Sequence, residues 1–426
     1  MISNAIARSI YDSRGRPTIE VDIITTNAIG RGMAPAGAST GAFEAVELRD
    51  EDGLGVQTAI GGFNAEVRPL LIGLDCREQE LIDKKLCVLD QTGNKSRLGG
   101  NTLIASSLAV INAAAAASNQ TLWRYLAQSE DLLMPLPEIQ IIGGGAHANN
   151  RINLQDIMAI PVGAPDWTTA LDWCARVYRS VGKIMDAENR IQGVADEGGF
   201  WPDVSCNEDT FSILTRGIEG AGLKPGEQVA ISIDVAANQF YHNGNYLIGS
   251  EKECLNSQQW VERLLDWTNR FPILMVEDPC AETDIAGYST FCEKFRDRGL
   301  VIGDDLVVTQ ADMIEKANDQ GAISGALIKP NQVGTVTEAR EALMKCRSLD
   351  LVTVLSARSG ETEDPSVMDL SVGLATDMVK VGSITRGERT AKWNQGIRIA
   401  ESLTRRGELV AATRFPWGKG LTDTSV

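Results

Sequence analysis

The chain has 426 residues, a length that favours two domains, or a barrel with an appended domain, over one ordinary hydrophobic core. Lys and Arg number 40 against 57 Asp and Glu, and the net charge of −17 disfavours nucleic acid and anionic membranes as partners. No run approaches the roughly 18 apolar residues that cross a bilayer, and no signal-like leader follows Met1. We therefore expect a cytoplasmic protein that contacts neither nucleic acid nor membrane.

Cysteine and histidine usage limits the metal chemistry. The eight cysteines form no C-x-x-C pair and have no histidine at zinc-site spacing, which favours scattered reduced thiols. His147 and His242 are the only two histidines, a count that excludes a His-ligated metal centre. Any metal is therefore expected on carboxylate oxygens, the ligands that Mg²⁺ prefers.

The first third of the chain combines strand and helix patterns. Apolar and acidic residues alternate over 19–23, which predicts a strand, and residues 32–41 form a loop rich in Gly, Ala and Ser. From about 78 to 126 the apolar residues recur at helical spacing. A polar break at 128–131, followed by Pro135 and Pro137, indicates a domain boundary.

Beyond this boundary, short apolar runs alternate with amphipathic segments. The runs lie at 152–160, 228–234, 272–277, 300–304, 325–329 and 351–356, and helix-like segments lie between them at 258–269, 311–319 and 336–347. Strands that alternate with helices imply parallel βα units, and six or more such units imply a barrel. We therefore expect an α/β fold, with a smaller α+β capping domain over 1–134 and a (β/α)8-type barrel over 135–426 that carries the active site.

Four of the predicted strands end in a charged residue, namely Asp234, Glu277, Asp304 and Lys329. The carboxyl ends of parallel barrel strands converge on one mouth, where catalytic groups lie. Each residue alone is readily explained as a polar strand end or a helix cap. Three converging carboxylates repel one another unless a cation lies between them, which indicates a magnesium site. Lys329 beside such a cation would have a lowered pKa and could act as a base.

Other polar segments carry weaker signals. The glycine-rich segment 37–41 offers backbone N–H groups and two hydroxyls, but it matches no phosphate-loop fingerprint. Residues 143–147 end in a histidine, and residues 196–199 place two acids on a tight turn. Residues 358–361 follow a predicted strand, and their Arg and Ser could clamp a phosphate or a carboxylate.

Taken together, these motifs resemble the enolase family over nearly the whole chain. The matching segments are 11–18, 37–41 and 44–50 in the first domain, and 196–199, 277–279, 303–306, 329–335 and 359–364 in the barrel. The resemblance implies an enolase-type (β/α)8 barrel with a smaller N-terminal domain, and two Mg²⁺ ions per active site. Lysine bases paired with magnesium are a known feature of this superfamily.

Carried over to this chain, the resemblance implies a role for each matching residue. The first Mg²⁺ would bind Asp234, Glu277 and Asp304, and Ser39 would reach the second Mg²⁺ and the phosphate. Lys329 would remove the proton α to the substrate carboxylate, and Glu197 would be the acid that helps the hydroxyl to leave. The remaining substrate contacts would come from Arg358 and Ser359 at the phosphate, Lys380 at the carboxylate, and His147, Gln155 and Asp156 around the closed pocket.

The chain departs from the family pattern at three positions. Ala357 stands where the family has His before Arg-Ser, and Asp156 follows Gln155 where the family has the longer Glu. Gly143 stands where the family usually has Asn. Because of these changes, the resemblance does not fix the identity of the substrate or the way in which the leaving group is protonated.

Three functions remain open at this point. The first is the ordinary enolase reaction, in which 2-phosphoglycerate gives phosphoenolpyruvate and water. The second is that of an enolase-like carboxyphosphonoenolpyruvate synthase in phosphonate or phosphinate biosynthesis, where Ala357 makes room for an extra group. The third is a catalytically weak homologue with a binding role, against which the intact acid cluster and Lys329 argue. A small phosphorylated or phosphonylated carboxylate as substrate, and a homodimer or a multiple of dimers, are implied by the resemblance alone.

Overall fold

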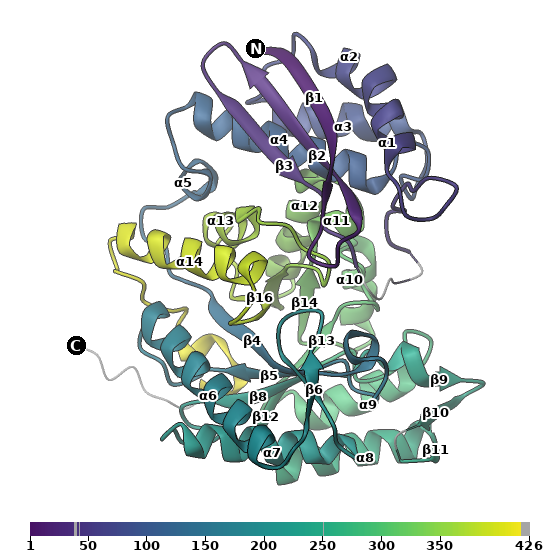
Figure 1. Cartoon of the computed structure of the whole chain (residues 1–426), viewed down its shortest axis with the longest axis vertical. Coiled ribbons are helices and arrows are strands. Elements are labelled where there is room, and N and C mark those ends of the chain that lie inside the picture. Colours follow the sequence, from purple (N-terminus) through teal and green to yellow (C-terminus); the bar gives the residue numbers. More distant parts are fainter. Residues whose placement is uncertain (38–40, 42, 250, 419–426) are drawn as a thin grey trace.

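A small antiparallel sheet and a group of helices precede the barrel in the computed structural model, which describes residues 1–37, 41, 43–249 and 251–418. The sheet has the order β1 (Ile2–Tyr11), β2 (Pro17–Thr25), β3 (Ile29–Met33). The helices are α1 (Gln57–Gly62), α2 (Arg68–Leu71), α3 (Gln79–Asp90), α4 (Gly100–Ala117) and α5 (Leu122–Leu126). This first domain lies above the barrel in Figure 1.

Strand β3 packs directly on the backbone of α4. A Cβ atom on Gly32 would lie 2.3 Å from the carbonyl oxygen of Ala105, and one on Gly30 would lie 2.0 Å from the backbone nitrogen of Ala113. Only glycine allows so close an approach. Helix α4 is long and apolar enough to span a membrane, but 83% of it is buried within the protein, which is the packing of a core helix.

Eight strands close into the barrel, which confirms the expected fold class. In order around the barrel they are β4 (Leu136–Gly143), β5 (Asp156–Ile160), β8 (Ala230–Asp234), β12 (Ile273–Glu277), β13 (Leu300–Gly303), β14 (Gly325–Ile328), β15 (Val352–Ser356) and β16 (Met378–Ser383). Pairing of β16 with β4 completes the circle. Nearly every residue of these strands is buried, as expected for strands covered on both faces.

The barrel differs from the all-parallel arrangement expected from the alternating pattern. Strand β5 runs antiparallel to both of its neighbours, β4 and β8. Its first residue, Asp156, therefore pairs with Asp234, the last residue of β8. Because of this reversal, a residue at the start of a strand lies at the same mouth as the residues at the ends of the parallel strands.

Helices surround the barrel, and three of them lie over the helix-like segments predicted at 258–269, 311–319 and 336–347. The helices around the barrel are α6 (Trp167–Ala187), α7 (Asn207–Gly220), α8 (Ser257–Arg270), α9 (Ile285–Phe295), α10 (Ala311–Asp319), α11 (Pro330–Val333), α12 (Val336–Ser348), α13 (Ser366–Gly373) and α14 (Gly387–Ser402). A hairpin of β6 (Ile191–Val194) and β7 (Phe200–Pro202) extends the sheet beside β4. A separate sheet of β9 (Tyr241–His242), β10 (Asn245–Ile248) and β11 (Glu253–Asn256) projects from the barrel (Figure 1).

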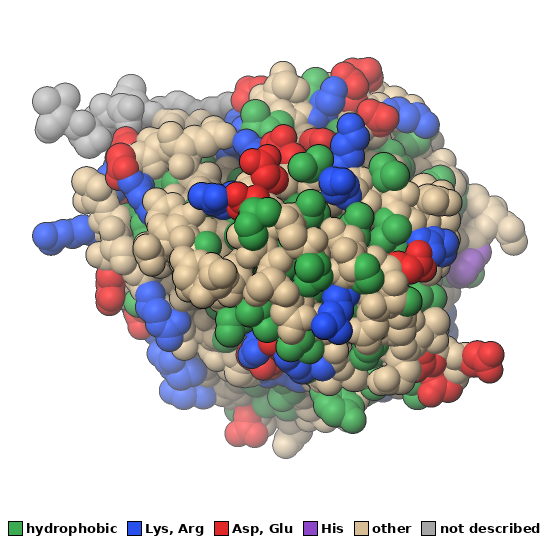
Figure 2. Space-filling view, turned by 90° about the horizontal axis from the view of Figure 1, so that it is seen from above, with side chains coloured by type: hydrophobic (Ala, Val, Ile, Leu, Met, Phe, Trp, Pro, Cys, Tyr) green, Lys and Arg blue, Asp and Glu red, His purple; other side chains and the backbone are tan. Residues whose placement is uncertain are grey.

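The N-terminal domain contacts the mouth of the barrel. Ala36 and Gly360 exchange two backbone hydrogen bonds of 2.8 Å, and the backbone N–H of Ala45 donates to the carbonyl of Gln332 at 2.7 Å. The face of the molecule seen from above carries interspersed basic and acidic side chains (Figure 2). The first domain thus contacts the rim of the barrel mouth.

Candidate active site

Three carboxylates lie at the ends of adjacent strands in the barrel mouth. Asp234 and Glu277 are the last residues of β8 and β12 and are paired in register, and Asp304 directly follows β13. All three are buried. The carboxylate of the neighbouring Asp278 accepts the backbone N–H groups of Asp304 and Asp305 at 3.0 and 2.8 Å. Asp278 therefore fixes the loop that presents Asp304.

The ammonium group of Lys380 lies among these carboxylates. Its Nζ donates to Asp234 Oδ2 at 3.0 Å and to Glu277 Oε2 at 2.6 Å, and it lies 3.7 Å from Asp156 Oδ2. Burial opposes the charged form, but these carboxylates outweigh it and hold the pKa of Lys380 well above its usual range. Burial, reinforced by Asp234, raises the pKa of Glu277 well above its usual range.

The residues present fit a magnesium ion. Glu277 Oε1 is buried and has no hydrogen-bond partner among the described residues, which leaves an oxygen lone pair directed at no donor. Carboxylate oxygens of Asp278, Asp304 and Asp305 also lie within 4.8 Å of one another. An all-oxygen donor set of this kind suits Mg²⁺, and a dication would relieve the repulsion that raises the pKa of Glu277.

Lys329 directly follows β14 and forms a short hydrogen bond with Asp304 Oδ2. Burial lowers the pKa of Lys329, but the Asp304 carboxylate outweighs this effect, so the pKa stands above its ordinary value. The sequence predicts a lowered pKa for this lysine only beside a bound cation. A lowered pKa would require a cation that neutralises Asp304 and leaves burial as the dominant effect.

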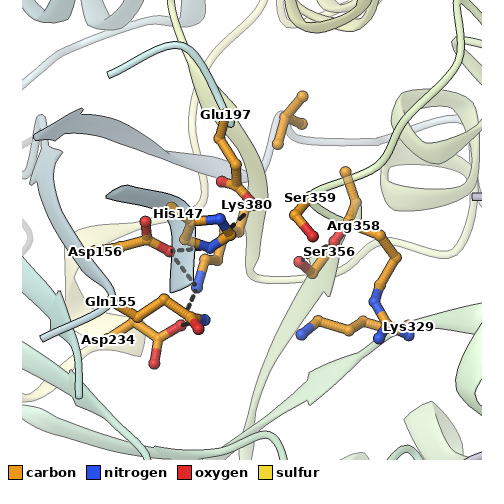
Figure 3. Close-up of a pocket in the computed structure, with 12 residues that line it drawn as sticks. His147, Gln155, Asp156, Glu197, Asp234, Lys329, Ser356, Arg358, Ser359 and Lys380 are labelled. Carbon is orange, nitrogen blue, oxygen red and sulfur yellow. Dashed lines mark hydrogen bonds and ion pairs between the residues drawn. The ribbon is translucent and has the colours of Figure 1, made fainter. Parts of the chain in front are cut away.

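Three ionisable side chains meet on the other side of the pocket (Figure 3). His147 Nε2 lies 3.8 Å from Asp156 Oδ2 and 3.9 Å from Glu197 Oε1. Burial raises the pKa of Asp156 to about 6, although His147 opposes the shift. Burial also disfavours the ionised form of Glu197, but His147 and Arg389 outweigh it and lower the pKa of that carboxyl. His147 and Arg389 therefore favour the carboxylate form of Glu197.

Arg358 is held by a residue of the N-terminal domain. Its Nη1 donates to Glu44 Oε2 and to Asn331 Oδ1, both at 3.0 Å. Gln332 Nε2 then links the two halves of the site, since it donates to Glu44 Oε1 at 3.2 Å and to Asp304 Oδ1 at 2.9 Å. The arginine and the carboxylate of Asp304 are therefore positioned by one shared hydrogen-bond network.

Most of the residues predicted from the sequence line one cavity of about 340 Å³, its open mouth included. They are His147, Gln155, Asp156, Glu197, Asp234, Lys329, Ala357, Arg358, Ser359 and Lys380, with Ser356 and Val381 completing the lining (Figure 3). Glu277 and Asp304 join this group through their contacts with Lys380 and Lys329. Ser39 lies outside the described residues. Ala357 is buried, and its N–H donates to the carbonyl of Lys380 at 2.8 Å.

The structure adds polar residues that the sequence patterns did not reveal. Glu138 on β4 is fully buried and pairs in register with Lys380, and burial raises its pKa to about 7. Gln140, two residues further, donates to Asp156 and accepts the backbone N–H of Gly199 at 2.8 Å. These polar residues interrupt an apolar strand, which is the one sequence signal that could have identified them.

Comparison with protein-family models covers nearly the whole chain. Residues 2–126 match the family described as "Enolase, N-terminal domain", and residues 131–414 match "Enolase, C-terminal TIM barrel domain". Members of this family typically use Mg²⁺, which agrees with the acidic clusters at the barrel mouth. The two matches follow each other in the order of the two parts of the fold, and the chain therefore belongs to the enolase family.

Proposed function

We propose that the chain is a magnesium-dependent lyase that converts 2-phosphoglycerate into phosphoenolpyruvate and water. One observation carries the proposal: a candidate base, Lys329, and a candidate acid, Glu197, lie on different sides of one small pocket (Figure 3). Two cations line the same pocket, Lys380 and Arg358. Elimination across a carbon–carbon bond requires this division of a base and an acid between two sides of the substrate.

The residues divide the work between the two ends of the substrate. Lys380 would hold the carboxylate, and Arg358 with Ser359 would hold the phosphoryl group. Lys329 Nζ would take the proton from the carbon α to the carboxylate. A protonated Glu197 would give its proton to the hydroxyl on the next carbon, which leaves as water while the double bond forms.

Asp234, Glu277 and Asp304 would hold the Mg²⁺ ion, and Ser39 would serve a second one. Bound there, Mg²⁺ would neutralise the substrate carboxylate and make the α-proton more acidic. In this structure the ammonium group of Lys380 donates hydrogen bonds to two of these carboxylates. Their engagement by a dication would release this ammonium group for the substrate.

A second candidate function rests on Ala357. This buried side chain lines the pocket next to Arg358, where the family pattern has an imidazole. The smaller side chain leaves space for an additional group near the phosphorus atom, as in a phosphonate or phosphinate substrate. The same acid, base and cations would serve this substrate.

The proposal is tested by adding 2-phosphoglycerate and Mg²⁺ to the purified protein and following phosphoenolpyruvate formation. We expect turnover that depends on Mg²⁺ and that falls by about 100-fold or more in Asp304→Asn, since the variant loses a ligand charge. Full turnover of this variant at low Mg²⁺ would contradict the metal assignment. Absence of wild-type turnover, with turnover of a phosphonate analogue, would select the second candidate.

A further inference from the structure

The cluster of His147, Asp156 and Glu197 has a geometry that the proposed reaction does not require. The three side chains come from separate segments: the turn Gly145–Ala148, the first residue of β5, and the turn between β6 and β7. All three are buried, and one ligand atom from each lies within 4.8 Å of the other two. In Figure 3 they point toward one another at the edge of the pocket.

The two distances from the imidazole nitrogen exceed those between ligands of one ion by only a small amount. The separations of 3.8 and 3.9 Å from His147 Nε2 are too long for direct hydrogen bonds. Ligand atoms about 2.1 Å from a tetrahedral Zn²⁺ lie about 3.4 Å apart. A contraction of about 0.5 Å would therefore bring each carboxylate to this distance from the imidazole nitrogen.

Neighbouring residues hold two of these groups in place. The amide of Gln140 donates to Asp156 Oδ1, and its oxygen accepts the N–H of Gly199, which anchors the turn that carries Glu197. The backbone of Glu197 is fixed in addition by a 2.9 Å hydrogen bond from Ser383 N–H to its carbonyl. Such supporting contacts orient the ligands of metal sites. His147 Nδ1 is buried and has no hydrogen-bond partner among the described residues, so the imidazole lacks the usual support.

We propose that His147, Asp156 and Glu197 form a binding site for a first-row transition-metal dication, with Zn²⁺ preferred. The site is chemically distinct from the all-oxygen magnesium site, because imidazole nitrogen favours Zn²⁺ and its neighbours over Mg²⁺. Three protein ligands would leave a fourth coordination position for water. The proposal revises the exclusion drawn from the histidine count, since one histidine suffices when two carboxylates converge on it.

An ion at this site would occupy Glu197, the proposed acid, and would block the elimination step. The binding itself does not depend on the reaction. Its test therefore stands even if 2-phosphoglycerate proves not to be the substrate, and failure of one proposal leaves the other intact.

The chain is well suited to a spectroscopic test with Mn²⁺ as the probe. Pulsed electron paramagnetic resonance detects coupling between Mn²⁺ and a ligand nitrogen, and ¹⁵N-labelled histidine identifies that nitrogen as imidazole. The chain has only His147 and His242, and His242 is exposed on β9, far along the sequence from the cluster. The magnesium site offers oxygen ligands alone, so it contributes no such coupling.

We expect histidine coupling in the wild type, in Asp304→Asn and in His242→Gln, and its loss in His147→Gln. One equivalent of Zn²⁺ should abolish the coupling by displacing Mn²⁺ from this site. Thermal melting of each variant would verify that it is folded, and Glu197→Gln provides a second variant that should weaken the coupled fraction by about tenfold or more. Absence of coupling in the wild type, its persistence in His147→Gln, or its survival with Zn²⁺ would overturn the proposal.

Discussion

Ala357 is the residue that separates the two candidate substrates. It is buried beside Arg358, and a side chain added there enters the pocket. If the ordinary reaction operates, Ala357→His should raise the turnover of 2-phosphoglycerate by about 10- to 100-fold. One charged hydrogen bond is worth about 1.5–3 kcal/mol, and each 1.4 kcal/mol corresponds to about a tenfold rate change. Initial rates of phosphoenolpyruvate formation would measure the effect.

Ala357→Leu is the matched control, because it fills the space without adding a polar group. This variant should not gain activity. If both variants remain folded but lose turnover of a phosphonate analogue, the space beside Ala357 accommodates part of that larger substrate. The proposal of the ordinary reaction would then have to be abandoned.

The division of labour between Lys329 and Glu197 can be tested by isotope exchange. Lys329→Ala should slow the exchange of the α-proton of 2-phosphoglycerate with deuterated water by about 100-fold or more, since the base is removed. Glu197→Gln should impair water loss yet retain exchange, because the lysine still takes the proton. Proton NMR of the substrate reports both rates, and normal exchange in the lysine variant would disprove its role as the base.

At the scale of residues, the sequence indicated the groups that lie at strand ends but not those that support them. Asp234, Glu277 and Lys329 could be identified because the chain places them after apolar runs. Glu44 could not, since its partner Arg358 is 314 residues away and only the folded chain brings the two together. Local patterns contain no information on such pairs.

At the scale of elements, the strands with continuous apolar runs were predicted and the interrupted ones were missed. The run at 272–277 corresponds to β12 and the run at 325–329 to β14. Strands β4 and β16, which close the barrel, were missed because buried polar residues break their apolar patterns. Glu138 on β4 and Lys380 on β16 face the site, so the requirements of the site obscured the pattern of the fold.

The direction of β5 also could not be predicted. An apolar run indicates that a strand is buried but not in which direction it runs. The general alternation of apolar runs with helix-like segments favoured a parallel strand. The reversal matters for the site, because it places Asp156 opposite Asp234. With a parallel strand, the same residue would lie at the far end of the barrel.

The close packing of β3 on α4 predicts a clear effect on stability. Gly32→Ala should reduce the free energy of unfolding by about 1–3 kcal/mol, because the new Cβ would meet the backbone of Ala105 at 2.3 Å and that of Ala109 at 2.5 Å. Urea denaturation would measure the loss. Gly61→Ala is the control, since this exposed helical glycine has no neighbouring atom within 4 Å and should gain about 0.5–1 kcal/mol. Equal stability of the two variants would contradict the packing argument.

At the scale of the whole molecule, the two domains share the active site. Glu44 from the first domain and Gln332 from the barrel connect Arg358 with Asp304. The barrel also buries carboxyl groups whose pKa values are raised, among them Glu138, Asp156 and Asp278. The stability of the whole protein should therefore respond to pH and to Mg²⁺.

The sign of the pH effect follows from the buried acids. Burial raises the pKa of Glu138 and of Asp278 to about 7, and that of Asp156 to about 6. Unfolded carboxyls titrate near pH 4, so the folded state binds more protons between about pH 4 and 7. The contribution of these groups to stability is complete below pH 4 and is lost as the pH rises through 6–7.

We therefore expect the melting temperature of the wild type to fall between pH 5 and pH 8 at low Mg²⁺. The melting temperature of Glu138→Gln should fall less over the same range. Each kcal/mol that the variant retains at pH 8 should raise its melting temperature by about 1 °C in a chain of 426 residues. Glu219→Gln, which changes an exposed glutamate, should follow the wild type.

Mg²⁺ binds the ionised carboxylates, so its stabilising effect should be larger at pH 8, where fewer protons compete, than at pH 5. Parallel pH profiles of wild type and Glu138→Gln would show that Glu138 does not titrate with the raised pKa in this range, and an Mg²⁺ effect independent of pH would show that the ion does not engage the carboxylates of the barrel mouth.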